Sequence, residues 1–307
     1  MSEFCAITTI YNPGTYKSRS KLYQDFRKRM EESGIALYTV ELAIGDQEFS
    51  VTDPSDPYNI QLRSEHELWY KENLVNIALQ KLPRRWDSIA WLDADIAFVR
   101  PDWVSATKEK LKQHSFVQLF SHVLDLGSHF EPLGVQEGFV YRYLTSKGRP
   151  CEDGQDIAAK SIGQTGYAWA SRRDVLEAIG GLIETSIVGS NDYFMAQALV
   201  GALTSEMTRM PGSNYAASLM EWQQKCERRT HRDLGYVNTT IFHYWHGRRR
   251  DRGYADRWRI LVENQFDPLV DLRKNEEGLF EFTNRNVALR EAIRSYFRSR
   301  NEDNSEA

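Results

Sequence analysis

The chain has 307 residues and a formal net charge of −4, with ordinary fractions of hydrophobic (41%) and charged (27%) residues. This composition excludes a disordered chain, a coiled coil and a collagen-like repeat. The mean hydropathy is −0.57, and no apolar run approaches the roughly 18 residues that a membrane span requires, which excludes an integral membrane protein. The negative net charge argues against nucleic-acid binding over the whole surface, although it allows a local basic patch.

The N-terminal residues and the cysteines both favour a reducing compartment. The first 14 residues include Glu3 and lack a basic region and a long apolar stretch, so they do not resemble a signal peptide. Cys5, Cys151 and Cys226 are too few and too scattered for a disulfide framework or a zinc site. We therefore expect a cytoplasmic protein.

Strand-like and helix-like segments alternate over the first two thirds of the chain, which predicts a sheet built from βαβ units. An apolar strand over 4–10 ends at turn residues, and a helix over 17–33 follows, with Leu22, Phe26 and Met30 recurring every four residues. The next predicted elements are a strand over 35–43, a loop over 45–57, a helix over 67–81, strands over 88–92 and 96–99, a helix from 101 to about 114, and a strand over 115–120.

The periodicity fades between residues 121 and 164, which is more typical of a functional insertion than of a structural connection. The pattern then resumes. It predicts a strand over 166–170, a helix over 174–179, a helix capped by Asn191 and Asp192 that runs to 203, a strand over 239–242, a packed amphipathic helix over 284–300, and frayed residues over 301–307.

Asp93 and Asp95 interrupt the apolar segment from Ser88 to Val99. On a continuous strand both carboxylates would point to the same side of an apolar sheet, which cannot accommodate them without a partner. They are more naturally placed at the carboxyl edge of an open α/β sheet, where ligands bind. Because like charges this close need a cation, we expect Mg²⁺ or Mn²⁺; the alternative is a turn cap or pairing with arginines.

Several residues near this edge are candidates for binding a phosphorylated ligand, because aspartates that hold a divalent ion commonly bridge it to a diphosphate. The strand over 4–10 brings Thr9 and Tyr11 near the edge, and the Tyr11 ring could stack on a nucleobase. The sequence lacks the glycine patterns of P-loop and dinucleotide-binding proteins. Further candidates, each more often an ordinary surface residue, are Arg63, Lys71 and Asn73.

Aromatic residues, two histidines and arginines are concentrated between Phe242 and Arg252. Six arginines and two aspartates between His243 and Ile260 give this segment a local charge of +4. A solvated surface explains an arginine run but not its combination with histidines and aromatics. We therefore expect the arginines from Arg248 to Arg252 to form a mobile clamp for phosphates, with Arg248 and Arg249 as the donor-binding residues.

Four segments of this sequence resemble, in their order along the chain, the nucleotide-sugar-dependent glycosyltransferases of the GT-A fold, especially the family-2-like members of bacteria and phages. They are residues 8–12, residues 91–95, residues 166–173 leading to 180–184, and Asn191-Asp192. The resemblance implies an α/β fold with a Rossmann-like mixed sheet flanked by helices. It also implies a GT-A domain over 1–250, with a donor half of about 1–120 and an acceptor half of about 121–250, and a packed C-terminal helical extension over 251–307.

The same resemblance implies roles for individual residues. Asp95 would hold a donor diphosphate through a metal, and Asp93 would reach the ribose or the metal. Asp192 matches the acid that deprotonates the acceptor hydroxyl in inverting members, with a helix cap as the alternative. A late histidine would be a further metal ligand, and His246 is preferred to His243 because it adjoins a glycine and the arginines.

We therefore expect a metal-dependent glycosyltransferase, a hexosyl- or pentosyltransferase, that uses Mn²⁺ or Mg²⁺ and a nucleotide sugar such as a UDP-sugar. The acceptor would be a glycan or a hydroxylated base in phage DNA, and a phage enzyme would act in the host cytoplasm. One alternative is a catalytically silent nucleotide-sugar-binding module. Another is a sugar nucleotidyltransferase, which needs a glycine-rich, lysine-containing loop that residues 11–17 match poorly.

Overall fold

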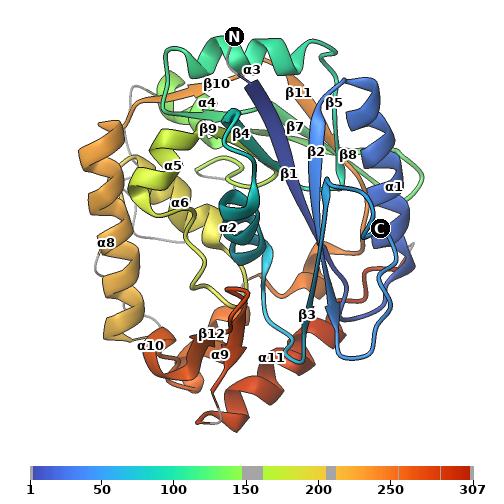
Figure 1. Ribbon diagram of the computed structural model, residues 1–307, viewed down its shortest axis with the longest axis vertical. Helices are drawn as coiled ribbons and strands as arrows, with labels where there is room; N and C mark the ends of the chain where they lie inside the picture. Colours follow the sequence, from blue (N-terminus) through green and yellow to red (C-terminus); the bar gives the residue numbers. More distant parts are fainter. Residues whose placement is uncertain (1–2, 147–161, 205–211, 255, 284, 305–307) are drawn as a thin grey trace.

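A seven-stranded mixed sheet forms the centre of the protein in the computed structural model, which describes residues 3–146, 162–204, 212–254, 256–283 and 285–304 (Figure 1). The strand order is β10-β6-β9-β4-β1-β2-β3. The strands are β1 (Glu3–Tyr11), β2 (Ala36–Ile44), β3 (Asn59–Ser64), β4 (Trp86–Leu92), β6 (Phe116–Gln118), β9 (Ala168–Arg172) and β10 (Leu234–Tyr236). The first four run parallel to one another, and β9 lies antiparallel between β4 and β6. The predicted α/β fold with a mixed sheet flanked by helices is confirmed.

Each face of this sheet has its own hydrophobic core, because side chains alternate between the faces along a strand. Cys5 and Ile7 pack on the face covered by α2 (Lys71–Lys81), α5 (Arg173–Ile179), α6 (Asn191–Leu199) and α8 (Ser213–Thr230). Phe4 and Ala6 pack on the opposite face, against α1 (Lys17–Glu32) and α3 (Trp103–Leu111). The alternation therefore fixes β1 as a central strand that is buried on both sides.

A smaller, four-stranded sheet extends the structure beyond β4, in the order β5-β11-β7-β8. Its strands are β5 (Ile96–Phe98), β7 (His122–Leu126), β8 (Pro132–Glu137) and β11 (Thr240–His243). The register places His243 opposite Ile96 on β5 and opposite Asp125 on β7. Segments that are far apart in the sequence therefore meet directly after Asp95.

The segment from 121 to 164, in which the sequence shows no clear period, contains regular structure. Its described part holds β7, β8 and the helix α4 (Phe139–Thr145), which the fading periodicity did not predict, and a functional role of this segment stays a prediction. The first four residues of β8 are all exposed, and a strand of this kind has no apolar alternation to reveal it. Residues 147–161, including Cys151, lie outside the described residues. Cys5 and Cys226 are buried free thiols.

Two helix starts differ from the prediction. The helix predicted from residue 67 begins at Lys71. Helix α6 begins at Asn191, and its N-cap is Ser190 in a left-handed conformation (φ 74°), so the interpretation of Asn191 and Asp192 as the cap is wrong. The Asn191 side chain instead accepts a hydrogen bond from the Ser186 amide and donates one to Glu72.

The last part of the chain, from Arg249, covers the end of the molecule at which β1, β2 and β3 finish (Figure 1). Its elements are the 3-10 helix η1 (Arg249–Arg252), α9 (Arg257–Glu263), α10 (Pro268–Asp271), the hairpin of β12 (Leu272–Lys274) and β13 (Phe280–Phe282), and α11 (Val287–Ser299). Leu289, Ile293 and Phe297 bury the apolar face of α11, which confirms the predicted packed amphipathic helix, whereas Val287 at its start is exposed. None of the helices in the described residues is long and apolar enough to span a membrane.

Candidate functional site

Asp93 and Asp95 lie in the turn between β4, which ends at Leu92, and β5, which begins at Ile96. The turn is fixed at both ends by backbone hydrogen bonds. The Asp93 amide donates to the Tyr167 carbonyl at 2.8 Å, and the Asp95 carbonyl accepts from the Tyr244 amide at 2.9 Å. The two carboxylates are therefore at a strand end rather than within an apolar strand.

Asp95, His243 and His246 form a cluster whose ligand atoms lie within 4.8 Å of one another. The His246 Nε2 atom is 3.0 Å from Asp95 Oδ2 and 3.2 Å from His243 Nε2. The antiparallel pairing of β5 with β11 causes this arrangement, because it places His243 beside the residue that follows Asp95. Both histidines reach the carboxylate, whereas the sequence offered them as alternatives.

The cluster fits a divalent metal ion on two observations. Asp95 Oδ1 is buried and has no hydrogen-bond partner among the described residues, although a buried carboxylate oxygen normally has one. Two imidazole nitrogens also face each other at 3.2 Å. Neighbouring ligands on one metal, with bonds of about 2.1 Å, lie about 3 Å apart, so the spacing of the nitrogens suits a shared ion.

His243 is oriented by a second carboxylate. Its Nδ1 atom is 2.8 Å from Asp125 Oδ1, its parallel-strand neighbour, and 3.2 Å from the Tyr167 hydroxyl. Donation of the Nδ1 proton to Asp125 leaves the Nε2 lone pair directed at Asp95 and His246, the arrangement found around metal-bound histidines. Arg249 contacts the other oxygen of Asp125 at 2.7 Å.

Burial and nearby charges keep Asp95 and His246 in the protonation states that a metal requires. Burial alone would raise the pKa of Asp95, but His246, His243 and Arg252 lower that pKa below its usual range. Burial, together with the Arg252 charge, lowers the pKa of His246 to about 4. At neutral pH the carboxylate is therefore ionised and the His246 imidazole is neutral.

Asp93, two residues away, has a different partner. Its carboxylate forms a close ion pair with the Lys71 ammonium group at the start of α2. Burial tends to lower the pKa of Lys71, but Asp93, Glu72 and Asp192 raise it above its ordinary value. Lys71 is therefore charged and balances the acids around it.

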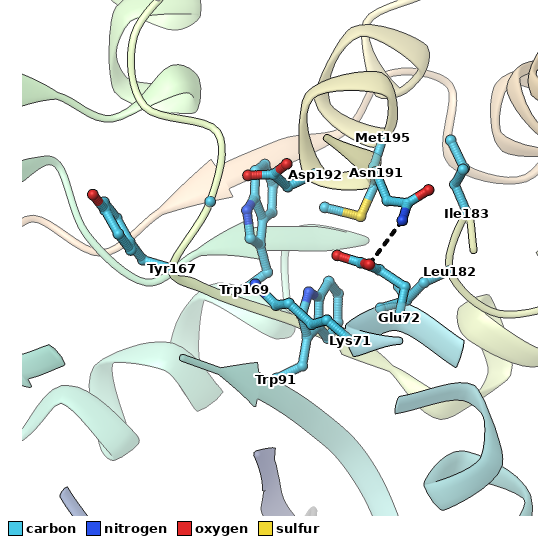
Figure 2. A pocket seen from close by; sticks show the side chains of 11 residues that line it. Lys71, Glu72, Trp91, Tyr167, Trp169, Leu182, Ile183, Asn191, Asp192 and Met195 are labelled. Carbon is cyan, nitrogen blue, oxygen red and sulfur yellow. Dashed lines mark hydrogen bonds between the residues drawn. The ribbon is translucent and has the colours of Figure 1, made fainter. Parts of the chain in front are cut away.

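A pocket lies beside this ion pair, and Figure 2 shows side chains of α2 and α6 facing each other across it. Its lining includes Lys71, Glu72, Tyr167, Trp169 and Asp192. A hydrogen bond of 2.8 Å from Asn191 Nδ2 to Glu72 Oε2 joins the two helices. The pocket therefore combines an amine, carboxylates and aromatic rings next to the Asp95 cluster.

Asp192 and Gly166 both line this pocket, and the Asp192 carboxylate lies against the backbone of Gly166. A Cβ atom at Gly166 would lie 2.8 Å from Asp192 Oδ2, which is too close for an ordinary contact. Thr165 Oγ1 is 3.5 Å from the same carboxylate oxygen. Gly166 therefore leaves the space that the Asp192 carboxylate occupies.

Among the arginines of the basic segment, Arg252 is the one that the structure buries near the cluster. Its guanidinium donates to the Gly247 carbonyl and the Tyr254 hydroxyl, and its Nε has no hydrogen-bond partner among the described residues. Arg249 is exposed and bonded to Asp125, and Arg248 precedes η1 as its N-cap. The segment is thus partly folded into the site rather than forming a free basic surface.

The structure does not bring the other predicted residues into the cluster. Arg63 donates to the Gly45 and Gln47 carbonyls at the edge strand β3. Asn73 is buried and binds the β12–β13 hairpin through Gly278 and Phe280. Tyr11 is a core residue surrounded edge-on by Trp69, Tyr70 and Phe297, and Thr9 lies within β1 opposite Val40. Donor binding by these four residues stays a prediction.

Asp125 and Glu302 escaped the sequence analysis, and Tyr167, although it lies in the segment 166–173, was not predicted as a site residue. Asp125 carried a weak signal, since it is an acid in the apolar alternation of residues 122–126. Tyr167 has a left-handed backbone conformation (φ 72°), which is uncommon for residues other than glycine and which no sequence motif predicts. Their roles depend on pairings between distant strands.

The comparisons with known proteins do not assign a family. No protein-family model matches the chain, and no curated protein matches it. The solved structures similar to it include a Drosophila β1,4-galactosyltransferase 7 in complex with manganese, UDP-Gal and xylobiose (12% identity, TM-score 0.35, 66% of this chain and 63% of that chain). Another is S. aureus TarS 1–349 in complex with UDP-GlcNAc (9% identity, TM-score 0.38, 79% of this chain and 58% of that chain).

A third similar structure is 4-diphosphocytidyl-2C-methyl-D-erythritol synthase from Anaerococcus prevotii (10% identity, TM-score 0.37, 78% of this chain and 87% of that chain). The chain spans less than two thirds of the length of the galactosyltransferase and TarS structures. TM-scores this low do not identify a function. The assignment below therefore rests on the residues of the site.

Proposed function

We propose that the protein is a metal-dependent glycosyltransferase of the GT-A type, with Asp95, His243 and His246 as metal ligands. The observation that carries the proposal is the convergence of these three side chains at the carboxyl edge of the sheet, beside a pocket that contains Asp192. Ligand binding at this edge is the rule in open α/β sheets. The sequence resemblance supplies the reaction class, and residues 1–120 and 121–250 are its proposed donor and acceptor halves.

Of the two predicted ions, Mn²⁺ suits the ligands better than Mg²⁺. Two imidazole nitrogens and one carboxylate oxygen form the set, and Mg²⁺ prefers oxygen ligands and water, whereas imidazole nitrogens favour transition metals. A bound divalent ion would stabilise the negative charge of a departing nucleotide diphosphate, such as UDP. Arg252, whose charge lowers the pKa of Asp95, would add to this stabilisation.

Asp192 is the proposed general base for the acceptor hydroxyl in an inverting transfer. Its carboxylate faces the pocket next to the Lys71–Asp93 pair, where an acceptor hydroxyl would approach the anomeric carbon of the donor. Asp192 takes the hydroxyl proton as the oxygen attacks the anomeric carbon, and the bond to the diphosphate oxygen breaks. The transferred sugar is a hexose or a pentose.

A glycan is the proposed acceptor in preference to a hydroxylated base in DNA. Binding to DNA phosphates requires available cations. Within the basic segment, Arg249 pairs with Asp125, Arg250 with Asp251 and Arg259 with Asp256. Arg252 and Arg257 are buried. Most of the +4 charge of this segment is thus compensated or buried. Binding of the protein to DNA that weakens as the salt concentration rises would instead favour a hydroxylated base in DNA as the acceptor.

The proposal is tested by incubating the protein with a panel of nucleotide sugars and Mn²⁺ and measuring the released nucleotide diphosphate. We expect slow hydrolysis of at least one donor, stopped by chelation of the metal and by Asp95→Ala. Intact donors that nevertheless bind with Mn²⁺ would indicate a silent binding module. Release of inorganic pyrophosphate from a nucleoside triphosphate and a sugar phosphate would indicate a nucleotidyltransferase.

A further inference from the structure

The residues that follow α11 lie against the loop that carries His246, although the sequence predicts that residues 301–307 are frayed. Glu302 is 1% exposed and Arg300 is 3% exposed, so the prediction is wrong for the described part, up to residue 304. Residues 305–307 lie outside the described residues. We call residues 300–304 the C-terminal segment.

The C-terminal segment contacts both neighbours of His246. Trp245 Nε1 donates a hydrogen bond of 2.6 Å to the Asn304 carbonyl. On the other side, a Cβ atom at Gly247 would lie 2.9 Å from both Asn301 O and Glu302 Cα, so only glycine fits against the segment without displacing it. His246 therefore lies between two residues whose positions the C-terminal segment fixes.

Glu302 forms the charged centre of this contact. Its carboxylate makes a bidentate pair with Arg19, at 2.5 and 2.7 Å, and a further bond of 2.8 Å with Arg300. Its Oε2 atom is 4.0 Å from His246 Nδ1. A buried carboxylate with two guanidinium partners is strongly held in one place, because each group left alone would be a buried unpaired charge.

The C-terminal segment is also anchored to the body of the protein. The Asp303 carboxylate accepts hydrogen bonds from the Lys17 and Ser18 amides at the start of α1, at 3.0 and 2.9 Å. The first amides of an α-helix have no hydrogen-bond acceptor within the helix. A carboxylate at this end is also stabilised by the helix dipole. Arg19 in turn donates to the Tyr11 carbonyl at the end of β1. The segment therefore connects the His246 loop to α1 and to the central sheet.

We propose that the C-terminal segment is a positioning element of the metal centre, and that it holds the His246 imidazole in the orientation that directs Nε2 at Asp95 and His243. The inference rests on the proposed function, since it assumes that this cluster binds a metal. Without the segment, Trp245 and Gly247 lose their contacts, and His246 must be ordered by the metal itself. The entropy of ordering then reduces the affinity for the ion.

The test compares the affinity for Mn²⁺ of the metal-free full-length protein and of two tryptophan variants by isothermal titration calorimetry. Trp245→Phe removes the donor to Asn304 and keeps an aromatic ring. Trp222→Phe is the matched control, because Trp222 Nε1 also donates to a backbone carbonyl, that of Gly181, and Trp222 lies in the hydrophobic core outside the Asp95 cluster. The melting temperature of each metal-free variant is recorded alongside.

We expect Trp245→Phe to weaken Mn²⁺ binding by about tenfold, within the range known for residues that support metal ligands. Trp222→Phe should leave the affinity unchanged whatever it does to the melting temperature. Equal affinities for Trp245→Phe and the wild type would overturn the proposed role. Equal losses in both tryptophan variants would overturn it too, because general destabilisation would then explain the effect.

Deletion variants give a second measurement. Removal of residues 301–307 should weaken Mn²⁺ binding further than Trp245→Phe, whereas removal of residues 305–307, which keeps every contact described above, should not. A folded 301–307 deletion with wild-type affinity would overturn the inference while leaving the metal centre intact. A wild-type protein that binds no Mn²⁺ would instead overturn the metal centre, and the positioning role with it.

Discussion

Asp93 and Asp95 are two residues apart in the same turn, yet their surroundings differ in kind. Asp95 faces the imidazoles of His243 and His246 and keeps one buried oxygen without a hydrogen-bond partner among the described residues. Asp93 is neutralised by Lys71, a cation that belongs to the chain itself. Among the described residues, Asp93 has a cationic side chain in direct contact, whereas the positive charge near Asp95, that of Arg252, acts on it without a direct ion pair, so that the imidazoles and the carboxylate can share a metal ion. We call these the imidazole side and the lysine side.

The comparison shows that a D-x-D pattern does not by itself assign equal roles to its two acids. The role of each acid depends on which side chain the fold places beside it. Strand β11 and the loop after it place histidines beside Asp95, and the start of α2 places Lys71 beside Asp93. The lysine side also adjoins Asp192 and the pocket. We therefore expect variants on the two sides to separate metal binding from turnover.

The largest effect is expected for Asp192→Asn on the lysine side. Loss of the general base should reduce transfer to the acceptor by about 10²–10⁴-fold, the usual contribution of such a group. Mn²⁺ affinity, measured by calorimetry, should stay at the wild-type value because Asp192 lies outside the three-residue cluster. Turnover close to wild type would remove Asp192 from the mechanism.

The next effect is a pH dependence of stability caused by Glu72. Burial raises the pKa of Glu72 to about 7, above the value of about 4.5 in the unfolded chain. The folded state therefore binds more protons between pH 4.5 and 7, and stability falls as pH rises through that window. A pKa difference of this size corresponds to about 3 kcal/mol.

Glu72→Gln removes this titration. Relative to the wild type, the variant should gain up to about 3 kcal/mol of unfolding free energy between pH 4.5 and pH 8, as measured by urea denaturation at each pH. A difference between the two proteins that does not change with pH would show that Glu72 titrates normally.

A smaller effect is expected on the imidazole side for Asp125→Asn. The amide oxygen can still accept the His243 Nδ1 proton, but the loss of charge should weaken Mn²⁺ binding by about tenfold. Asp174→Asn is a matched control, because Asp174 also pairs with arginines but lies at the surface on α5. Unchanged affinity in Asp125→Asn would mean that Asp125 has only a structural role.

The sequence predicted those features of the fold and the site that depend on residues close together in the chain. The apolar run that ends at Asp93 and the repeated apolar spacing of α1 predicted the sheet edge and the covering helix, because each depends on neighbours within a few residues. The pairing of β5 with β11 and the burial of Glu302 could not be predicted in this way. Both depend on contacts between segments more than 100 residues apart, for which a single sequence carries no periodic signal.

Histidine assignment illustrates the same limit. From the sequence alone, His246 was preferred to His243 because it adjoins a glycine and the arginines. The strand ends at His243, and the loop through Tyr244 and Trp245 turns His246 back toward it, so that both Nε2 atoms face Asp95. The end of a three- or four-residue strand is below the resolution of sequence patterns.

The most direct test of the difference between the two sides is calorimetric titration of Mn²⁺ into the wild-type protein, Asp95→Asn and Asp93→Asn. We predict that Asp95→Asn abolishes measurable binding, because it removes the charged ligand between the two histidines. Asp93→Asn should bind Mn²⁺ with an affinity close to that of the wild type, since Lys71 already neutralises Asp93. Equal loss of binding in both variants, or full binding by Asp95→Asn, would contradict the account.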